Sequence, residues 1–146
     1  MTRRVELPAA LAGALATQAR AASPQECCGL LEGIRDTDRW RVTALHPARN
    51  LSPFADRFEI DPRDQFAAQK AARANAAAII GCYHSHPGGQ AQPSAADRAG
   101  AGQEDFVWLI AGSEGIAAFV YLRGEFFGAD CVTSSIWALV KSVAPA

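Results

Sequence analysis

The stretch "AIIGCYHSHPGGQAQPSAAD", residues Ala78 to Asp97, decides how the middle of this sequence folds. Its apolar beginning is typical of a buried strand, which we expect to end at the histidine pair. The glycines and prolines of "PGGQAQP" exclude regular structure and indicate a loop. Ser94, with an acidic residue three positions later, has the form of a capping box and predicts a short helix that ends near Gly102. The stretch therefore predicts a strand, a loop and a capped helix.

The rest of the sequence alternates between the same two kinds of element. We expect helices over residues 8–22 and 61–77, and strands over residues 5–7, 27–34, 39–46, 57–60, 106–112, 116–123 and 125–132. Pro8 and Pro62 stand in the first turns of the helices, where a missing N–H removes no helical hydrogen bond. This order of elements predicts an α/β fold in which helices sandwich a mixed β-sheet.

The composition is that of one ordinary globular domain. The chain has 146 residues, of which 49% are hydrophobic and 20% are charged. Such a chain is long enough to bury one core, so we expect a single domain over residues 1–146. The net charge of -1 gives no reason to expect nucleic acid as a partner, because nucleic-acid binding usually needs a basic patch. No apolar run approaches the roughly 20 residues of a membrane span, so we also expect no membrane partner.

The N-terminal segment is similar to an export signal, but its residues favour a folded strand and helix. Its paired arginines and alanine-rich middle are similar to a twin-arginine signal, whereas Glu6 and Pro8 interrupt the would-be apolar region. The cysteines lack the C-x-x-C spacing of a zinc knuckle and are typical of buried thiols in a reducing compartment. These cysteines are Cys27, Cys28, Cys82 and Cys131. Both features predict a cytoplasmic protein.

Two histidines at the end of the central strand offer the start of a metal site. His84 and His86 are two residues apart, so their side chains fall on one face of the strand. Zn²⁺ favours nitrogen ligands, and Asp97 could return across the loop to supply an oxygen. Three protein ligands would leave the fourth position open, as in catalytic zinc sites. An H-x-H pair is a weak signal, however, and a capping box also explains the aspartate. The spacing leaves both interpretations open.

A second motif favours the metal site. The pattern H-S-H-P, followed by a loop and S-x-x-D, resembles the signature of the JAMM (MPN-plus) zinc metalloprotease family. That family also carries a glutamate just before a C-G-L-L strand that follows the first helix, and this chain has "PQECCGLLEG" at residues 24–33. The resemblance continues through "RFEIDPRDQF" and covers most of the chain. It implies the JAMM/MPN fold, which is similar to that of the cytidine deaminases.

The resemblance implies a role for each matched residue. His84, His86 and Asp97 match the ligands of a Zn²⁺ cofactor. Glu26 matches the general base, and Ser94 matches the residue that helps to stabilise the oxyanion. Zinc makes water acidic enough to supply hydroxide at neutral pH, and a nearby carboxylate can take that proton and return it to the leaving amine. Only the resemblance selects Glu26, since nothing in the spacing distinguishes it among the 15 acidic residues.

Three residues near these motifs have simpler explanations. We expect Cys82 to pack beneath the site and Ser85 to hydrogen-bond a ligand carboxylate or a neighbouring backbone group. His46 precedes a proline and is expected to end a strand without binding metal. None of the three is predicted as a ligand.

The family resemblance also implies a substrate class. Family members hydrolyse amide or isopeptide bonds after the C-terminal tail of ubiquitin-like proteins. About eight residues separate Asp97 from the strand at Phe106, which leaves no room for the insertion of the eukaryotic deubiquitinating members. The chain therefore resembles the compact bacterial type, which implies a ubiquitin-like or sulfur-carrier protein with a Gly-Gly tail as partner. The sequence does not determine the oligomeric state and leaves a homodimer open.

Two other functions remain as alternatives. A non-catalytic MPN scaffold or interaction module would share the fold, but the complete set of matched residues argues against it. A zinc deaminase would share the metal and the general architecture. Deaminases need H-x-E together with P-C-x-x-C, and this sequence has neither. A zinc-dependent peptidase or isopeptidase is therefore the preferred interpretation.

Overall fold

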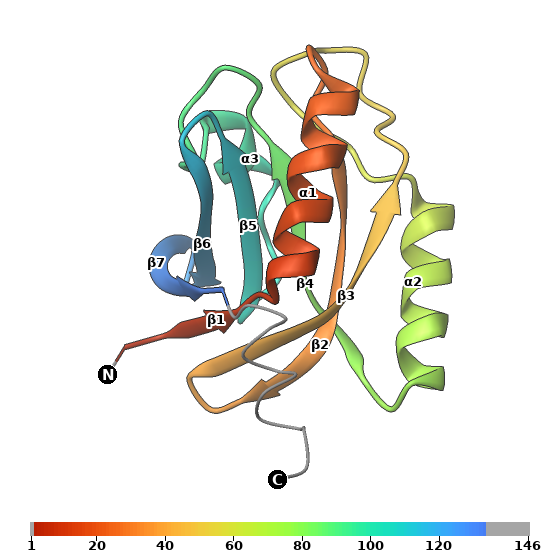
Figure 1. Cartoon of the computed structure of the whole chain (residues 1–146), viewed down its shortest axis with the longest axis vertical. Coiled ribbons are helices and arrows are strands. Elements are labelled where there is room, and N and C mark those ends of the chain that lie inside the picture. Colours follow the sequence, from red (N-terminus) through yellow and green to blue (C-terminus); the bar gives the residue numbers. More distant parts are fainter. Residues whose placement is uncertain (1, 134–146) are drawn as a thin grey trace, which may run out of the picture.

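Strand β4 (Ala78–Ser85) lies inside a mixed sheet, between β2 and β5 (Figure 1). The computed structural model describes residues 2–133. The other strands are β1 (Arg4–Glu6), β2 (Cys28–Asp36), β3 (Arg39–Ala48), β5 (Phe106–Gly112), β6 (Gly115–Leu122) and β7 (Glu125–Val132). The helices are α1 (Ala9–Ala22), α2 (Pro62–Ala74) and α3 (Ala95–Gly100). Each predicted element is present with boundaries shifted by a few residues, apart from the strand predicted at 57–60.

The sheet closes on itself, a feature that the predicted sandwich did not include. The strands pair in the order β1-β3-β2-β4-β5-β6-β7, and β1 pairs with β7 as well as with β3. Residues 4–6 are the parallel partners of residues 130–132. Strands β4 and β5 also run parallel, whereas β2 is antiparallel to both of its neighbours. The mixed sheet is confirmed, and among the described residues it forms a closed barrel.

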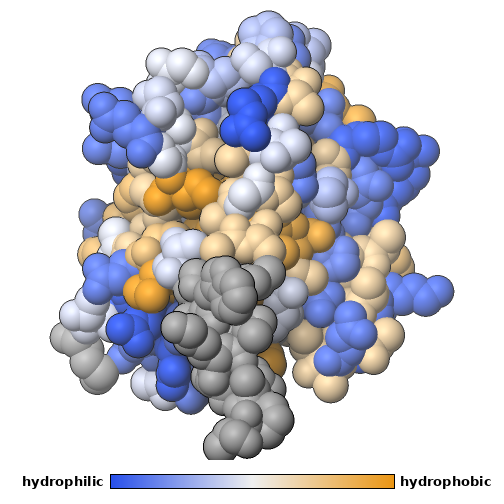
Figure 2. All heavy atoms as spheres, in the orientation of Figure 1, coloured by the Kyte–Doolittle hydropathy of each residue, from blue (hydrophilic) through white to orange (hydrophobic). Residues whose placement is uncertain are grey.

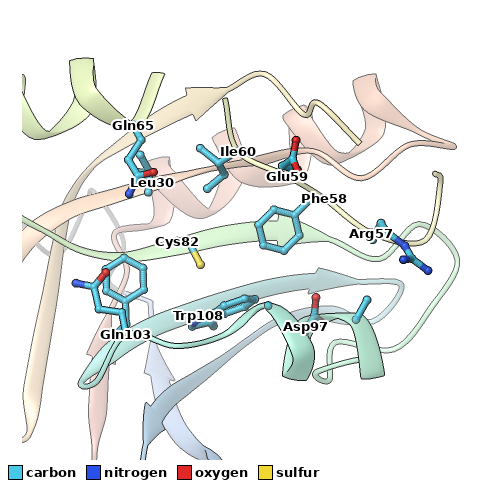
Figure 3. A pocket seen from close by; sticks show the side chains of 13 residues that line it. Leu30, Arg57, Phe58, Glu59, Ile60, Gln65, Cys82, Asp97, Gln103 and Trp108 are labelled. Carbon is cyan, nitrogen blue, oxygen red and sulfur yellow. The ribbon is translucent and has the colours of Figure 1, made fainter. Parts of the chain in front are cut away.

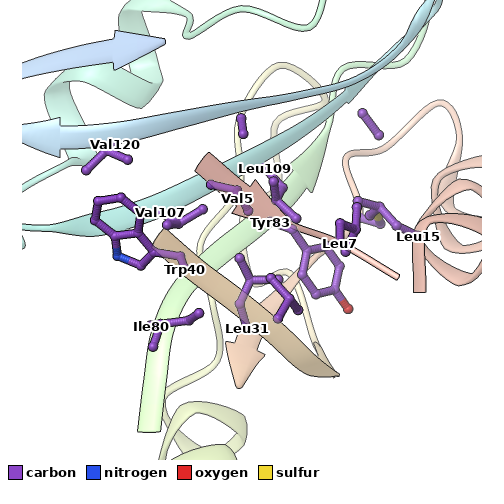
Figure 4. Packing of buried hydrophobic residues seen from close by; sticks show 14 of the residues in the cluster. Val5, Leu7, Leu15, Leu31, Trp40, Ile80, Tyr83, Val107, Leu109 and Val120 are labelled. Carbon is purple, nitrogen blue, oxygen red and sulfur yellow. The ribbon is translucent and has the colours of Figure 1, made fainter. Parts of the chain in front are cut away.

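Helices cover opposite faces of β4. Tyr83 packs in the larger apolar core together with Leu15 of α1, and its hydroxyl donates to Gln18 Oε1 at 2.6 Å (Figure 4). Cys82 packs in a second cluster with Ala68 of α2. Because successive residues of a strand face opposite sides, α1 and α2 lie on the two sides of this strand. The predicted placement of helices on both faces is therefore seen around β4.

The segment 57–60 was wrongly predicted to be a strand. It forms only an isolated bridge, in which Ile60 pairs with Asn50. The Asn50 side-chain oxygen accepts from the N–H groups of Ser52 and Glu59, each at 2.9 Å. A side chain therefore satisfies backbone donors that a sheet ladder would otherwise use. The result is a loop over residues 51–60, which runs beside the end of β4.

Exposed apolar side chains occur on β2, α2 and β7 and in the loop over residues 51–60. The large ones are Ile34, Leu51, Phe54, Phe66 and Val132. The face seen in Figure 2 is polar along its margins and has apolar groups near its middle, as is common for globular proteins. In the described part of the chain, no helix is both long enough and apolar enough to span a membrane.

Candidate metal centre

The two histidines of β4 place their ring nitrogens side by side. The Nε2 atoms of His84 and His86 are 3.0 Å apart, in agreement with side chains that share one face of the strand. The His84 ring is completely buried. It stacks on Phe58 with a centroid distance of 4.4 Å and meets Trp108 edge-on at 5.7 Å. The two aromatic rings therefore fix His84 and shield it from solvent.

Asp97 reaches the histidines by way of the predicted capping box. The Ser94 hydroxyl accepts from the Asp97 N–H at 3.1 Å, and the Ser94 N–H donates to Asp97 Oδ2 at 2.9 Å. The same Oδ2 lies 3.0 Å from His84 Nε2 and 3.2 Å from His86 Nε2. The cap directs the carboxylate toward both rings, so the capping and metal-site interpretations of this stretch are compatible.

Three ligand atoms at these distances fit a zinc ion. Tetrahedral ligands about 2.0–2.1 Å from zinc lie about 3.3 Å from one another. The three separations here are 3.0, 3.0 and 3.2 Å. A ring nitrogen that carries no proton offers a lone pair, as does the carboxylate oxygen, so a cation can hold the three atoms together. Two imidazoles and one carboxylate are also a ligand set found in catalytic zinc sites.

Burial and hydrogen bonds shift the pKa of each of the three groups. Burial lowers the pKa of His84, which favours its neutral form. The hydrogen bond with Asp97 raises the pKa of His86. Burial acts to raise the pKa of Asp97, but hydrogen bonds with both histidines outweigh it and hold that pKa below its ordinary value. The site therefore contains a charged carboxylate beside imidazoles, which would attract a cation.

A docked loop orients His86. Its Nδ1 lies 2.8 Å from the carbonyl oxygen of Gln90, which leaves Nε2 free to face the other ligands. The Ser113 N–H donates to the Gly89 carbonyl at 2.8 Å and ties this loop to the β5–β6 turn. A Cβ at Gly112 would collide with the backbone nitrogen of Ala91. The absence of a side chain at Gly112 thus permits the loop to approach closely enough to orient His86.

Glu26 lies beside the histidine pair in a buried position. Its residue is 4% exposed, and ligand atoms of Glu26, His84 and His86 lie within 4.8 Å of one another. Its Oε1 has no hydrogen-bond partner among residues 2–133. Burial raises the pKa of Glu26 to about 7. A buried, unpartnered carboxylate is costly, so the site provides a group that is poised to meet water or substrate and to exchange a proton near neutral pH.

A pocket of about 420 Å³ opens beside Asp97 (Figure 3). Phe58 and Ile60 line it from one side, and Trp108 lies with Asp97 on the other. Cys82 lies between the two sides and is 4% exposed. The thiol is therefore a wall of the pocket rather than one of the three converging ligand atoms, in line with the packing role expected from the sequence.

The third histidine lies in a different cluster. His46 Nε2 is 2.9 Å from Glu32 Oε1, and Asn75 donates to Glu32 Oε2 at 3.3 Å. This arrangement joins β3 and the end of α2 to the buried Glu32. The prediction that His46 ends its strand was wrong, because β3 continues to Ala48. The carboxylate partner of His46 was not predicted either.

Three contributors to the site were not found by sequence reasoning. They are Asn50, Phe58 and Gln90. Phe58 lies in the segment 57–60 that was wrongly predicted to be a strand, Asn50 lies in the loop before it, and Gln90 acts through its backbone carbonyl. A backbone carbonyl such as that of Gln90 leaves no residue-specific signal in the sequence. Phe58 could have been noticed only because "RFEI" belongs to the stretch "RFEIDPRDQF", which resembles the family.

The comparison with known families agrees with this geometry. The sequence profile described as prokaryotic homologs of the JAB domain matches residues 8–122. The match extends over more than half of the chain and contains every residue of the site described above. The chain therefore belongs to the prokaryotic JAB family, and its resemblance to the JAMM family is confirmed.

Two curated relatives differ in how much of their length they share with this chain. The desampylase of Haloferax volcanii is 35% identical over 105 residues, which are 70% of this chain and 74% of that protein. Tail tip assembly protein K of Escherichia phage N15 is 31% identical over 114 residues, or 77% of this chain and 43% of that protein. The chain thus spans most of the archaeal relative but less than half of the phage protein.

Two solved structures are similar to this one. The solution structure of a protein from Desulfitobacterium hafniense has a TM-score of 0.81 at 30% identity and covers 90% of this chain and 93% of that chain. The solution structure of a protein from Salinibacter ruber has a TM-score of 0.65, also at 30% identity, and covers 100% of this chain and 95% of that chain. Both similarities extend over nearly the whole fold.

Proposed function

We propose that the chain is a zinc-dependent peptidase or isopeptidase that hydrolyses the amide bond after the C-terminal tail of a ubiquitin-like or sulfur-carrier protein. One observation carries the proposal. Three ligand atoms of His84, His86 and Asp97 converge within 3.2 Å of one another beside a buried carboxylate without a hydrogen-bond partner among the described residues. A scaffold would have no need to maintain such an arrangement, which is costly unless an ion or a substrate meets it.

The distances support an assignment of the ligands and the base. Asp97 Oδ2 touches both histidine nitrogens, whereas Glu26 lies near them without a hydrogen bond to either. The closest three-atom set therefore contains Asp97. We assign His84, His86 and Asp97 as the ligands and Glu26 as the general base, although Glu26 is also near enough to the histidines to be considered as a ligand.

The protein groups divide the chemistry of amide hydrolysis among them. When bound, zinc acts as a Lewis acid and lets a water molecule lose its proton near neutral pH. Glu26 accepts that proton and delivers it to the nitrogen of the leaving amine. The Ser94 hydroxyl, which only accepts in its capping bond, keeps its proton for the developing oxyanion. One such donor is commonly worth about 10²–10³ in rate.

The curated relative named a desampylase supports the substrate class, because its name denotes removal of a ubiquitin-like modifier. We infer that the substrate of this chain also ends in Gly-Gly, as the compact bacterial type of the family implies. The described cysteines are free thiols, and we place the reaction in the reducing cytoplasm.

Mass spectrometry of candidate carrier proteins tests this function. Each carrier is extended by one or two residues after Gly-Gly, or is linked through that tail to a lysine, and is incubated with the zinc-loaded protein. We expect a product that ends in Gly-Gly, and no product after metal chelation. Intact carriers in the presence of folded, zinc-loaded protein would instead favour the non-catalytic scaffold.

A further inference from the structure

Glu26 is held by backbone contacts rather than by its own side chain. It belongs to no regular element, because α1 ends at Ala22 and β2 begins at Cys28. Its Oε1 has no hydrogen-bond partner within residues 2–133. A carboxylate in such a connection could swing away from the histidine pair unless neighbouring groups fixed the chain. The position of Glu26 therefore depends on whatever holds its peptide units.

The peptide unit that joins Glu26 to Cys27 is held on both sides by side chains. The Glu26 carbonyl accepts from Asn50 Nδ2 at 3.0 Å. The Cys27 N–H donates to Ser85 Oγ at 2.8 Å, and the Ser85 N–H donates back to the Cys27 carbonyl at 3.2 Å. Neither Ser85 nor Asn50 is near Glu26 in sequence, so tertiary structure creates this clamp.

Ser85 connects the clamp to the metal centre. It stands between His84 and His86 on the chain and is 1% exposed. Its side chain points to the opposite face of β4 from the two histidines, as strand geometry requires. The residue that separates the two histidines thus fixes the backbone of Glu26, and any shift of β4 moves the histidines and the clamp together.

Asn50 connects the clamp to the wall of the pocket. Its Oδ1 accepts from the N–H groups of Ser52 and Glu59, and its Nδ2 also donates to the Arg57 carbonyl at 3.4 Å. Both hydrogens and both lone pairs of the amide are therefore in use. The amide has one rigid orientation, in which the loop that carries Phe58 is bonded to the backbone of Glu26.

We propose that Ser85 and Asn50 are positioning residues for Glu26. Together they clamp the peptide unit between Glu26 and Cys27 and so fix the carboxylate relative to His84 and His86. This inference rests on the proposed role of Glu26 as general base. Substitutions in the clamp lower kcat because they misplace the base, while metal binding and substrate binding continue.

Steady-state kinetics of clamp variants test the inference on the full-length, zinc-loaded protein. We expect Ser85→Ala to lower kcat about 10–100-fold, the range typical of lost supporting hydrogen bonds at metal sites. Its KM and its zinc content remain close to those of the wild type. Ser85→Thr, which keeps the hydroxyl, restores most of the rate. Thr43→Ala removes a hydroxyl bond to the carbonyl of Glu32 on β2, outside the clamp, and serves as a matched control with full activity.

A double substitution shows whether Ser85 acts through Glu26. In a Glu26→Gln background, measured with excess enzyme, Ser85→Ala is expected to cause no further loss of rate. Losses that multiply in the double variant would overturn the proposal, because Ser85 would then act independently of the base. If the wild-type protein is active and neither Ser85→Ala nor Asn50→Ala changes kcat, the proposal is also overturned.

Amide hydrogen exchange tests the clamp without any substrate. We expect the Cys27 N–H to exchange at least about 10-fold faster in Ser85→Ala than in the wild type, since about 1.4 kcal/mol of protection is tenfold in rate. Asn50→Asp keeps the acceptor for the loop but loses the donor to Glu26, so it also speeds this exchange. Unchanged exchange in both variants contradicts the clamp. A wild-type protein that shows the clamp by exchange but hydrolyses no carrier contradicts the proposed function instead.

Discussion

Glu26 is the residue on which the proposed enzymatic function depends most. The substitution Glu26→Gln keeps the size and polarity of the side chain but cannot accept a proton. Because general acid–base groups commonly contribute about 10²–10⁴-fold, we expect the rate of carrier hydrolysis to fall by that factor. Zinc content should be unchanged, since the proposed ligands are intact.

Glu59→Gln is the matched control for this measurement. Glu59 is a nearby residue that lines the pocket, but its side chain is not part of the group formed by Glu26 and the histidines. Full activity of Glu26→Gln would place the base elsewhere, and loss of zinc from this variant would identify Glu26 as a ligand.

The loop between β4 and α3 orients His86 through the carbonyl of Gln90. Gly112→Ala forces the loop away from the β5–β6 turn because the new Cβ meets the Ala91 nitrogen. The Gln90 carbonyl then loses its contact with His86 Nδ1. We expect zinc affinity to fall about 10–100-fold although no ligand is changed, as measured by competition with a chromogenic chelator. Gly128→Ala on β7, where a Cβ meets nothing within 4 Å, should bind zinc normally. Equal affinities in the two variants would contradict this role of the loop.

The start of α2 provides a pH-dependent contribution to stability. Asp61 caps this helix, and its hydrogen bonds to Arg63 lower its pKa to about 2. The folded pKa is below the unfolded value of about 3.9, so the stabilisation is complete above that value and is lost as the pH falls toward 2. Thermal unfolding at several pH values should therefore show that Asp61→Asn loses less stability than the wild type between about pH 4 and 2.

Two substitutions of Asp61 distinguish the stability that comes from the helix cap from the stability that comes from the charge. Asparagine is a good N-cap and alanine is not, so Asp61→Ala should have the lower Tm at pH 7, by about 3 °C relative to Asp61→Asn. Identical Tm values would show that the capping hydrogen bond to the Arg63 N–H contributes nothing to the stability of the fold.

At the scale of the whole molecule, local signals predicted most elements but not the closure of the sheet. Prolines at helix starts, the capping box and the alternating apolar residues act within a few positions of each other, so they can be read from sequence. The pairing of residues 4–6 with residues 130–132 joins the two ends of the described chain, and no local pattern encodes it. The prediction of a strand at 57–60 failed because the Asn50 side chain bonds the Arg57 carbonyl and the Glu59 N–H, which a sheet ladder would otherwise use.

The candidate site shows the same division between local and tertiary information. The spacing of His84, His86 and Asp97 was readable, and the structure brings the three together. Family resemblance supplied Glu26, which spacing alone could not select. The aromatic ring of Phe58 and the clamp formed by Ser85 and Asn50 depend on segments that meet only after folding. Motifs thus indicate the groups that are proposed to react, and tertiary structure indicates the groups that are proposed to position them.

Zinc binding by the purified chain tests the central claim most directly, because every proposed role depends on one metal centre. Metal analysis and calorimetric titration of the chelated protein should give about one zinc per chain, with a rise in Tm on addition of zinc. His84→Ala should lose this binding, whereas His46→Gln, which alters the one histidine outside the site, should retain it. A well-folded wild-type protein with no affinity for zinc would contradict the account.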